Sequence, residues 1–175
     1  MKEHLQKKFK MLNLINISII KKNYLICFLI ITLVFFLDRI SKIKIISHQI
    51  SNNRLYVNDY INLDLVWNSG IGFGFFSSTS SLIYNSITFV IGAVILFLIY
   101  LIIKSNFIDK ILFSFVLGGA FGNFYDRLVF FAVPDFIDVH YQNFHWFTFN
   151  IADIFITLGI ITLVTKDLFF NNDKN

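Results

Sequence analysis

Four long apolar segments constrain the fold of this chain more than any other feature. A helix needs about 20 mostly apolar residues to cross the hydrocarbon core of a bilayer. Residues 24–46, 81–103, 111–131 and 147–168 each reach that length. The composition agrees, since 56% of the 175 residues are hydrophobic and only 15% are charged. We therefore predict an all-α membrane protein with four transmembrane helices.

Lysines beside these segments predict their orientation. Six lie within the first 22 residues, and four more lie between the second and third segments or at the C-terminal end, at Lys104, Lys110, Lys166 and Lys174. Because positively charged flanks stay in the cytoplasm, we expect both termini on that side. The predicted regions are a basic cytoplasmic extension, a membrane domain and a cytoplasmic tail, at residues 1–22, 23–168 and 169–175.

The 43–80 loop, on the opposite side, carries a strand pattern. Apolar side chains recur at every second position from Ile61 to Trp67, which is the period of a strand with one apolar face. Asn58-Asp59 upstream forms a typical turn pair. We predict a small extracytoplasmic β-sheet in this loop. Glycines that permit tight turns or the close approach of a ligand chain follow at alternate positions, at Gly70, Gly72 and Gly74.

The polar residues of the apolar segments and outer loops gather near one membrane face. With the predicted topology they occupy outer helix ends or outer loops, as Asp38, Asn68, Asn123, Asp126, Arg127, Asp135, Asn150 and Asp153. Helical spacing places Asn123, Asp126 and Arg127 on one face of the third segment. Two ion pairs, Asp38 with Lys42 and Asp126 with Arg127, offer a purely structural explanation, because charges in a membrane commonly pair.

Asp135 and Asp153 differ, because no neighbouring cation in the sequence neutralises either carboxylate. Two adjacent carboxylates share a proton, so one can accept a proton from water while the other protonates a carbonyl oxygen. This pattern indicates general acid–base hydrolysis. The structural alternative is that Asp153 caps the last helix and that Asp135 is a solvated acid in the 132–146 loop.

Other chemistries fit the sequence less well. Asp138, His140 and His145 lack the helical spacing and the glutamate partner of a common metal motif, so we expect neither a metal nor a cofactor. No serine has a histidine partner in a nucleophilic pattern. The single cysteine, Cys27, excludes an intramolecular disulfide. The net charge of +4 comes with a lysine-rich N-terminus, which favours a topology signal over nucleic-acid binding.

Five sequence blocks resemble a known family. They are Asp38–Lys42, Asn68–Gly74, Gly118–Arg127, Val133–Asp138 and Phe149–Asp153. Their content and order resemble bacterial lipoprotein signal peptidase, also called signal peptidase II, over roughly residues 38–168. The chain departs from the family at Ile71-Gly72, where many members have two alanines, and in its basic N-terminal extension.

The resemblance implies an aspartic endopeptidase of the bacterial inner membrane. Such enzymes remove signal peptides from diacylglyceryl-modified prolipoproteins, cutting just before the lipid-carrying cysteine. The expected partners are therefore lipidated prolipoproteins and membrane lipids, with no nucleic acid, and the protein is expected to be monomeric. The active site would lie near the periplasmic face.

The resemblance also assigns roles to residues. Asp135 and Asp153 would be the catalytic pair. Substrate or pair positioning would fall to Asn68, Asn123, Arg127 and Asn150, and structural support to Asp38, Lys42, Gly70 and Asp126. The alternative function is a small transporter or proton-coupled channel, which would also use acids inside the membrane. Transporters, however, favour polar sites at mid-bilayer with repeat symmetry, and the sequence contains no evident repeat.

Overall fold

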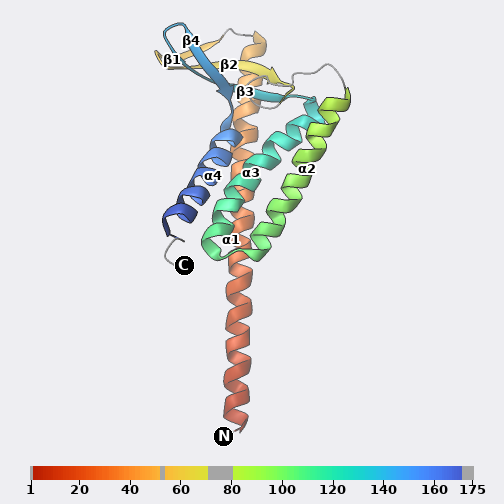
Figure 1. The fold of residues 1–175 in the computed structure, drawn as a ribbon, viewed down its shortest axis with the longest axis vertical. Helices are drawn as coiled ribbons and strands as arrows, with labels where there is room; N and C mark the ends of the chain where they lie inside the picture. Colours follow the sequence, from red (N-terminus) through yellow and green to blue (C-terminus); the bar gives the residue numbers. More distant parts are fainter. Residues whose placement is uncertain (1, 52–53, 71–80, 171–175) are drawn as a thin grey trace.

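The computed structural model describes residues 2–51, 54–70 and 81–170. Four helices lie side by side beneath a four-stranded antiparallel sheet (Figure 1). The helices are α1 (Lys2–Ser51), α2 (Ser81–Lys104), α3 (Phe107–Phe130) and α4 (Ile151–Phe170). The strands are β1 (Leu55–Asn58), β2 (Ile61–Asn68), β3 (Val133–Tyr141) and β4 (Phe144–Phe149).

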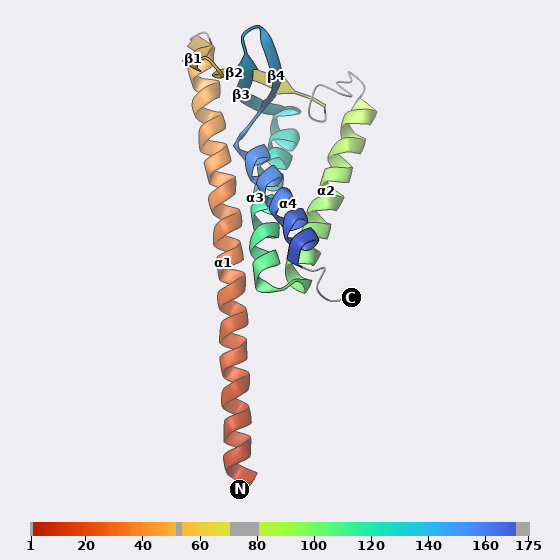
Figure 2. The ribbon, with the colours of Figure 1, turned by 60° about the vertical axis from the view of Figure 1, so that its left-hand side comes forward.

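Helix α1 is longer than the predicted first span. It is one continuous helix of 50 residues, and its N-terminal part extends beyond the other three helices (Figure 2). The predicted boundary between residues 22 and 23 thus falls inside a helix. The physical reason is that residues 2–51 contain no proline or glycine, so no residue breaks the helix there.

Three helical stretches among the described residues are long and apolar enough to cross a membrane. They are Ile19–Gln49, Tyr84–Lys104 and Phe107–Phe130. Helix α4 is not among them, because its 20 residues include Asp153, Lys166 and Asp167. The fourth membrane crossing therefore stays a prediction.

The sheet has the order β1-β2-β3-β4. Strand β2 confirms the strand predicted from residue 61 onward, and the Asn58 side chain accepts hydrogen bonds from the backbone N–H groups of Tyr60 and Ile61 in the predicted turn. The 132–146 segment was predicted to be a loop, and this prediction is wrong. It forms most of the β3–β4 hairpin, so α4 begins at Ile151 instead of residue 147.

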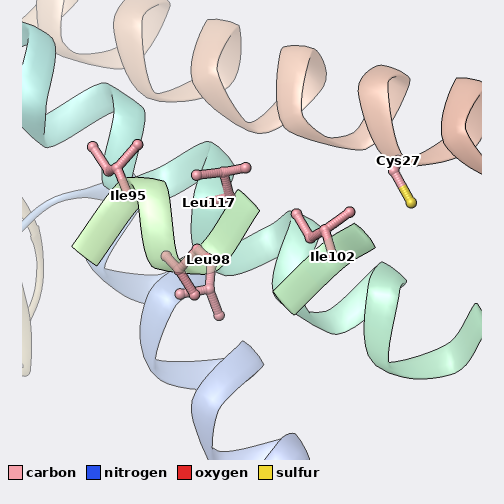
Figure 3. Close-up of a cluster of buried hydrophobic side chains, with 6 residues drawn as sticks. Cys27, Ile95, Leu98, Ile102 and Leu117 are labelled. Carbon is pink, nitrogen blue, oxygen red and sulfur yellow. The ribbon is translucent and has the colours of Figure 1, made fainter. Parts of the chain in front are cut away.

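Helix α3 is central, with α1, α2 and α4 all packed against it. One buried apolar cluster joins α1, α2 and α3 (Figure 3), and consists of Cys27, Ile95, Leu98, Ile102, Val116 and Leu117. Two glycines of α3 permit close approach of the neighbouring helices. A Cβ atom at Gly118 would lie 2.8 Å from Cβ of Val34, and one at Gly119 would lie 2.6 Å from the carbonyl oxygen of Ala152. This packing brings the C-terminal half of α3 against the start of α4.

Candidate active site

Asp135 lies within strand β3 and not in a polar loop as predicted. It is only 4% exposed and lies between the buried residues Pro134 and Phe136. Two side-chain amides hold its carboxylate. Asn68, the last residue of β2, donates to Oδ2 at 3.0 Å, and Asn150 donates to Oδ1 at 2.6 Å. Asp135 is therefore a fixed, desolvated carboxylate, which contradicts the interpretation of a solvated acid.

Asp153 lies in the first turn of α4. Its carboxylate accepts a hydrogen bond from the backbone N–H of Asn150 at 3.1 Å, while the Asn150 side chain accepts one from the N–H of Asp153 at 3.1 Å. This reciprocal arrangement is a capping box. The other carboxylate oxygen of Asp153 accepts from the amide of Asn123 at 2.8 Å. Asp153 thus does take part in a helix cap, but it also faces a second helix.

Asn150 connects the two carboxylates. Its side-chain NH₂ group binds Asp135, while its side-chain oxygen and backbone N–H bind Asp153. Asn150 is fully buried. Because one rigid residue contacts both acids, the separation of the acids is set by the N-terminus of α4.

The environment raises the pKa of Asp135. Burial is the main cause, and the negative charge of Asp153 adds to it. The hydrogen bonds from Asn68 and Asn150 and the charge of Lys42 oppose the shift, and the resulting pKa is about 6. A carboxyl group with this pKa can exist in either protonation state near neutral pH, as acid–base catalysis requires.

A buried lysine supports the site from α1. The ammonium group of Lys42 donates to Asp38 and Asp126, both at 2.7 Å, and to the side-chain oxygen of Asn123 at 2.9 Å. Since Asn123 accepts from Lys42 and donates to Asp153, its amide orientation is fixed from both sides. Lys42 is fully buried, so these acceptors replace its water shell.

The ion pairs differ in part from the prediction. The pair of Asp38 and Lys42 is present, and the second oxygen of Asp38 accepts from the backbone N–H of Ala152 at 3.0 Å. Asp126, however, pairs with Lys42 and Arg39, not with its neighbour Arg127. Consecutive helical residues point in different directions, which explains the correction. Sequence reasoning assigned Arg39 no role, although it stands within the first sequence block.

Arg127 spans the site and the end of β2. Its guanidinium donates to the carbonyl oxygen of Gly70 and lies 5.9 Å from the ring centre of Tyr84. The Tyr84 hydroxyl in turn donates to the backbone carbonyl of Arg127 at 2.6 Å. The buried Nη1 of Arg127 has no hydrogen-bond partner among the described residues. Of the predicted glycines, Gly70 is described, while Gly72, Gly74 and the Ile71-Gly72 departure lie outside the described residues.

Both carboxylates open onto one cavity of about 500 Å³. Its polar lining includes five of the predicted site residues, Asn68, Asn123, Arg127, Asp135 and Asp153. Apolar side chains from α2, α4 and the hairpin form most of the remaining wall, among them Ile87, Val90, Ile91, Phe147, Phe149 and Ile156. The cavity therefore combines two acids and a cation with an apolar wall. This lining suits a ligand in which an extended peptide backbone is joined to an apolar segment.

Among the described residues, three potential metal ligands lie close together in space, namely Asp138, His140 and His145. Neither Asp135 nor Asp153 is part of that group. The acids of the cavity are held by amides and a backbone N–H, so their geometry does not require a cation between them.

The chain matches the family model described as signal peptidase (SPase) II over residues 30–169. The lipoprotein signal peptidase of Pelagibacter ubique (strain HTCC1062) is 48% identical over 155 residues, which cover 87% of this chain and 93% of the relative. The lipoprotein signal peptidase of Anaplasma phagocytophilum (strain HZ) is 38% identical over 142 residues, covering 80% and 90%.

A solved structure is also similar to this one. It is described as a bacterial membrane enzyme determined by the in meso method at 2.3 Å resolution. The TM-score is 0.70 with 29% sequence identity, and the match covers 85% of this chain and 91% of the other.

Proposed function

Because this chain belongs to the signal peptidase II family, we propose that it removes signal peptides from prolipoproteins, with Asp135 and Asp153 as the catalytic pair. The observation that carries this proposal is that both carboxylates line one cavity and are joined through Asn150. The family is one of aspartic proteases, in which two carboxylates sharing one proton are sufficient for peptide hydrolysis.

The reaction needs one ionised and one protonated carboxyl group. The ionised member takes a proton from a water molecule as the water oxygen bonds to the scissile carbonyl carbon. The protonated member gives its proton to the carbonyl oxygen, which forms a neutral tetrahedral intermediate. When the C–N bond breaks, the nitrogen receives the proton taken from water, while a hydroxyl group of the intermediate returns its proton to the ionised carboxylate as the new C=O bond forms, so the pair again holds one proton. The pKa of about 6 at Asp135 suits this exchange near neutral pH.

The surrounding residues position the pair and the substrate. Asn68, Asn123 and Asn150 each donate to a carboxylate oxygen, so they would fix the orientation of the two acids, which also line the cavity. Nη1 of Arg127, which has no hydrogen-bond partner among the described residues, would bind a carbonyl oxygen of the substrate backbone. Asp38, Lys42 and Asp126 form the support that ties α1 and α3 to the start of α4, and Gly70 anchors Arg127.

The membrane arrangement belongs to the proposal as well. Helix α4 serves as the fourth crossing, both termini face the cytoplasm, and the sheet and the acids lie at the outer face of the inner membrane. The lysine-rich N-terminus supports this orientation. A diacylglyceryl-modified substrate could keep its acyl chains in the bilayer while its apolar signal peptide packs against the apolar cavity wall. We also propose that the protein acts as a monomer.

The test uses two forms of one substrate. Purified protein in a lipid bilayer is incubated with a diacylglyceryl-modified preprolipoprotein and with its unlipidated form, and shortening is followed by mass spectrometry. We expect cleavage of the lipidated form directly before the modified cysteine, and none by Asp135→Asn. Equal cleavage of both forms would contradict the substrate class, and no cleavage of either would contradict the peptidase function.

A further inference from the structure

The β3–β4 hairpin gathers three potential metal ligands outside the catalytic pair. Asp138 and His140 lie two residues apart on β3, and His145 on β4 is the cross-strand partner of His140. One ligand atom from each residue lies within 4.8 Å of the other two. The rings of His140 and His145 are stacked, with centres 5.2 Å apart. Two imidazoles and one carboxylate form a donor set typical of zinc sites.

The spacing suits a shared ion. Nδ1 of His145 lies 2.9 and 3.0 Å from the two carboxylate oxygens of Asp138. Zinc binds nitrogen and oxygen ligands at about 2.0–2.2 Å, so two ligands of one ion lie about 3 Å apart. The side chain of His145 is 45% exposed, which leaves its ring free to turn toward an ion and leaves space for water ligands.

The buried negative charge of Asp138 also favours binding of a cation. The Asp138 side chain is only 9% exposed, and a carboxylate this buried is costly without a positive partner. Its contact with Arg54 is weak, because the guanidinium lies 3.5 Å away and the side chain is 41% exposed. When the Asn62 oxygen is turned toward His140, it also accepts from the Arg54 guanidinium, so an incoming ion must displace Arg54 from both residues. Surface ion pairs of exposed side chains contribute little to stability, so an incoming cation can displace the arginine from the carboxylate.

A second residue orients His140. The buried amide of Asn62 lies 3.1 Å from Nδ1 and 3.2 Å from Nε2 of His140, and its oxygen, when turned toward the ring, accepts a hydrogen bond from whichever of the two nitrogens carries the proton. Metal-binding histidines characteristically donate one ring N–H to such an oxygen, which leaves the other nitrogen with a lone pair for the ion. His140 therefore has the partner that a ligand histidine needs.

We propose that Asp138, His140 and His145 form a binding site for a divalent transition-metal ion such as Zn²⁺, with water completing the coordination and Arg54 displaced. Two imidazole ligands favour such an ion over Mg²⁺ or Ca²⁺, which prefer oxygen. The sequence predicts no metal site, because only strand pairing brings His145 to His140. Asp138 and His145 border the same hollow as Asp135, so the ion would lie near the catalytic pair without belonging to it. The proposal is independent of the peptidase function.

The experiment measures zinc binding by the full chain. Protein freed of its affinity tag is treated with a chelator, loaded with ZnCl₂ and desalted, and zinc is counted by mass spectrometry. Affinity follows from competition with a chromophoric chelator. We expect one zinc ion per chain. Asp138→Asn and His145→Ala should each weaken binding at least about tenfold, because loss of an outer-shell partner alone costs about 10- to 100-fold.

Two further variants separate ligand loss from damage to the fold. Arg54→Gln should bind zinc more tightly than the parent, since it removes the competing cation, and a damaged fold cannot tighten binding. His48→Gln removes a histidine from α1 and should leave binding unchanged. An absence of zinc in the parent, parental affinity in Asp138→Asn, or no tightening in Arg54→Gln would each overturn the proposal.

Discussion

Asn150 and Asp135 are joined by a 2.6 Å hydrogen bond in which the Asn150 amide donates to the carboxylate. The same asparagine caps α4 through Asp153. Asn150→Ala should therefore lose both a helix cap and the connection between the acids. We expect a loss of about 1 kcal/mol of stability together with a loss of cleavage, measured as thermal midpoint and kcat/KM.

Asn106 provides the matched control for Asn150. It caps α3, where its side chain accepts from the N–H of Asp109 at 3.1 Å. Asn106→Ala should cost similar stability while leaving cleavage near the parental rate. If both variants lost cleavage equally, the role of Asn150 would be capping alone.

The raised pKa of Asp135 predicts a pH dependence of stability. Between the usual pKa of 3.8 and the folded value of about 6, the folded state binds more protons than the unfolded state. Stability contributed by this group must therefore fall as pH rises through that window. The thermal midpoint of Asp135→Asn should lack this part of the decline, so the variant gains stability relative to the parent from about pH 4 to about pH 7. Parallel midpoint curves for the two proteins would contradict the shift.

Lys42 should be required for the fold as well as for the site. Lys42→Met leaves Asp38 and Asp126 facing each other without their shared cation. Removing one member of a buried ion pair costs about 3–5 kcal/mol, so we expect little folded protein after membrane extraction. Lys44→Gln, at an exposed position of α1, is the comparison and should extract normally. Equal yields of monodisperse protein from Lys42→Met and Lys44→Gln would show that Lys42 is not required for the fold.

Arg127→Lys should lower cleavage while preserving insertion. The guanidinium binds the carbonyl of Gly70 with one nitrogen, and its buried Nη1 has no hydrogen-bond partner among the residues that the structure describes. A lysine ammonium is a point charge on a flexible stem and cannot hold both positions. We expect kcat/KM to fall about 10- to 100-fold, the cost of one lost charged hydrogen bond. A parental kcat/KM at equal protein level would refute the second contact.

The helices and most site residues were predictable because their signals are local. Apolar length predicts α2 and α3 to within a few residues, and the period-two pattern predicts β2. The sequence also predicts Asn68, Asn123, Asp135 and Asp153 as site residues. Polar residues near a membrane cost free energy of desolvation, so they are candidates for functional sites. The structure brings these four onto one cavity.

The missed features depend on contacts between distant segments. Strand β3 pairs with β2, as at Val66 and Asp135, and its buried first half has no alternating pattern to identify a strand. The partner of Asp126 on α1, Arg39, is 87 residues away in sequence and meets it only after α1 packs on α3. Local spacing therefore favoured the wrong neighbour, Arg127.

Cleavage of a diacylglyceryl preprolipoprotein by Asp135→Asn, Asp153→Asn and the double variant tests the catalytic pair most directly. Each single variant should lose at least about 10⁴-fold in rate, and the double variant should lose little more, because either acid alone leaves the pair incomplete. Asp64→Asn, on strand β2 of the same sheet, should cut at the parental rate. Cleavage by Asp135→Asn or Asp153→Asn at a rate comparable to the parent, in inserted and folded protein, would contradict the catalytic pair.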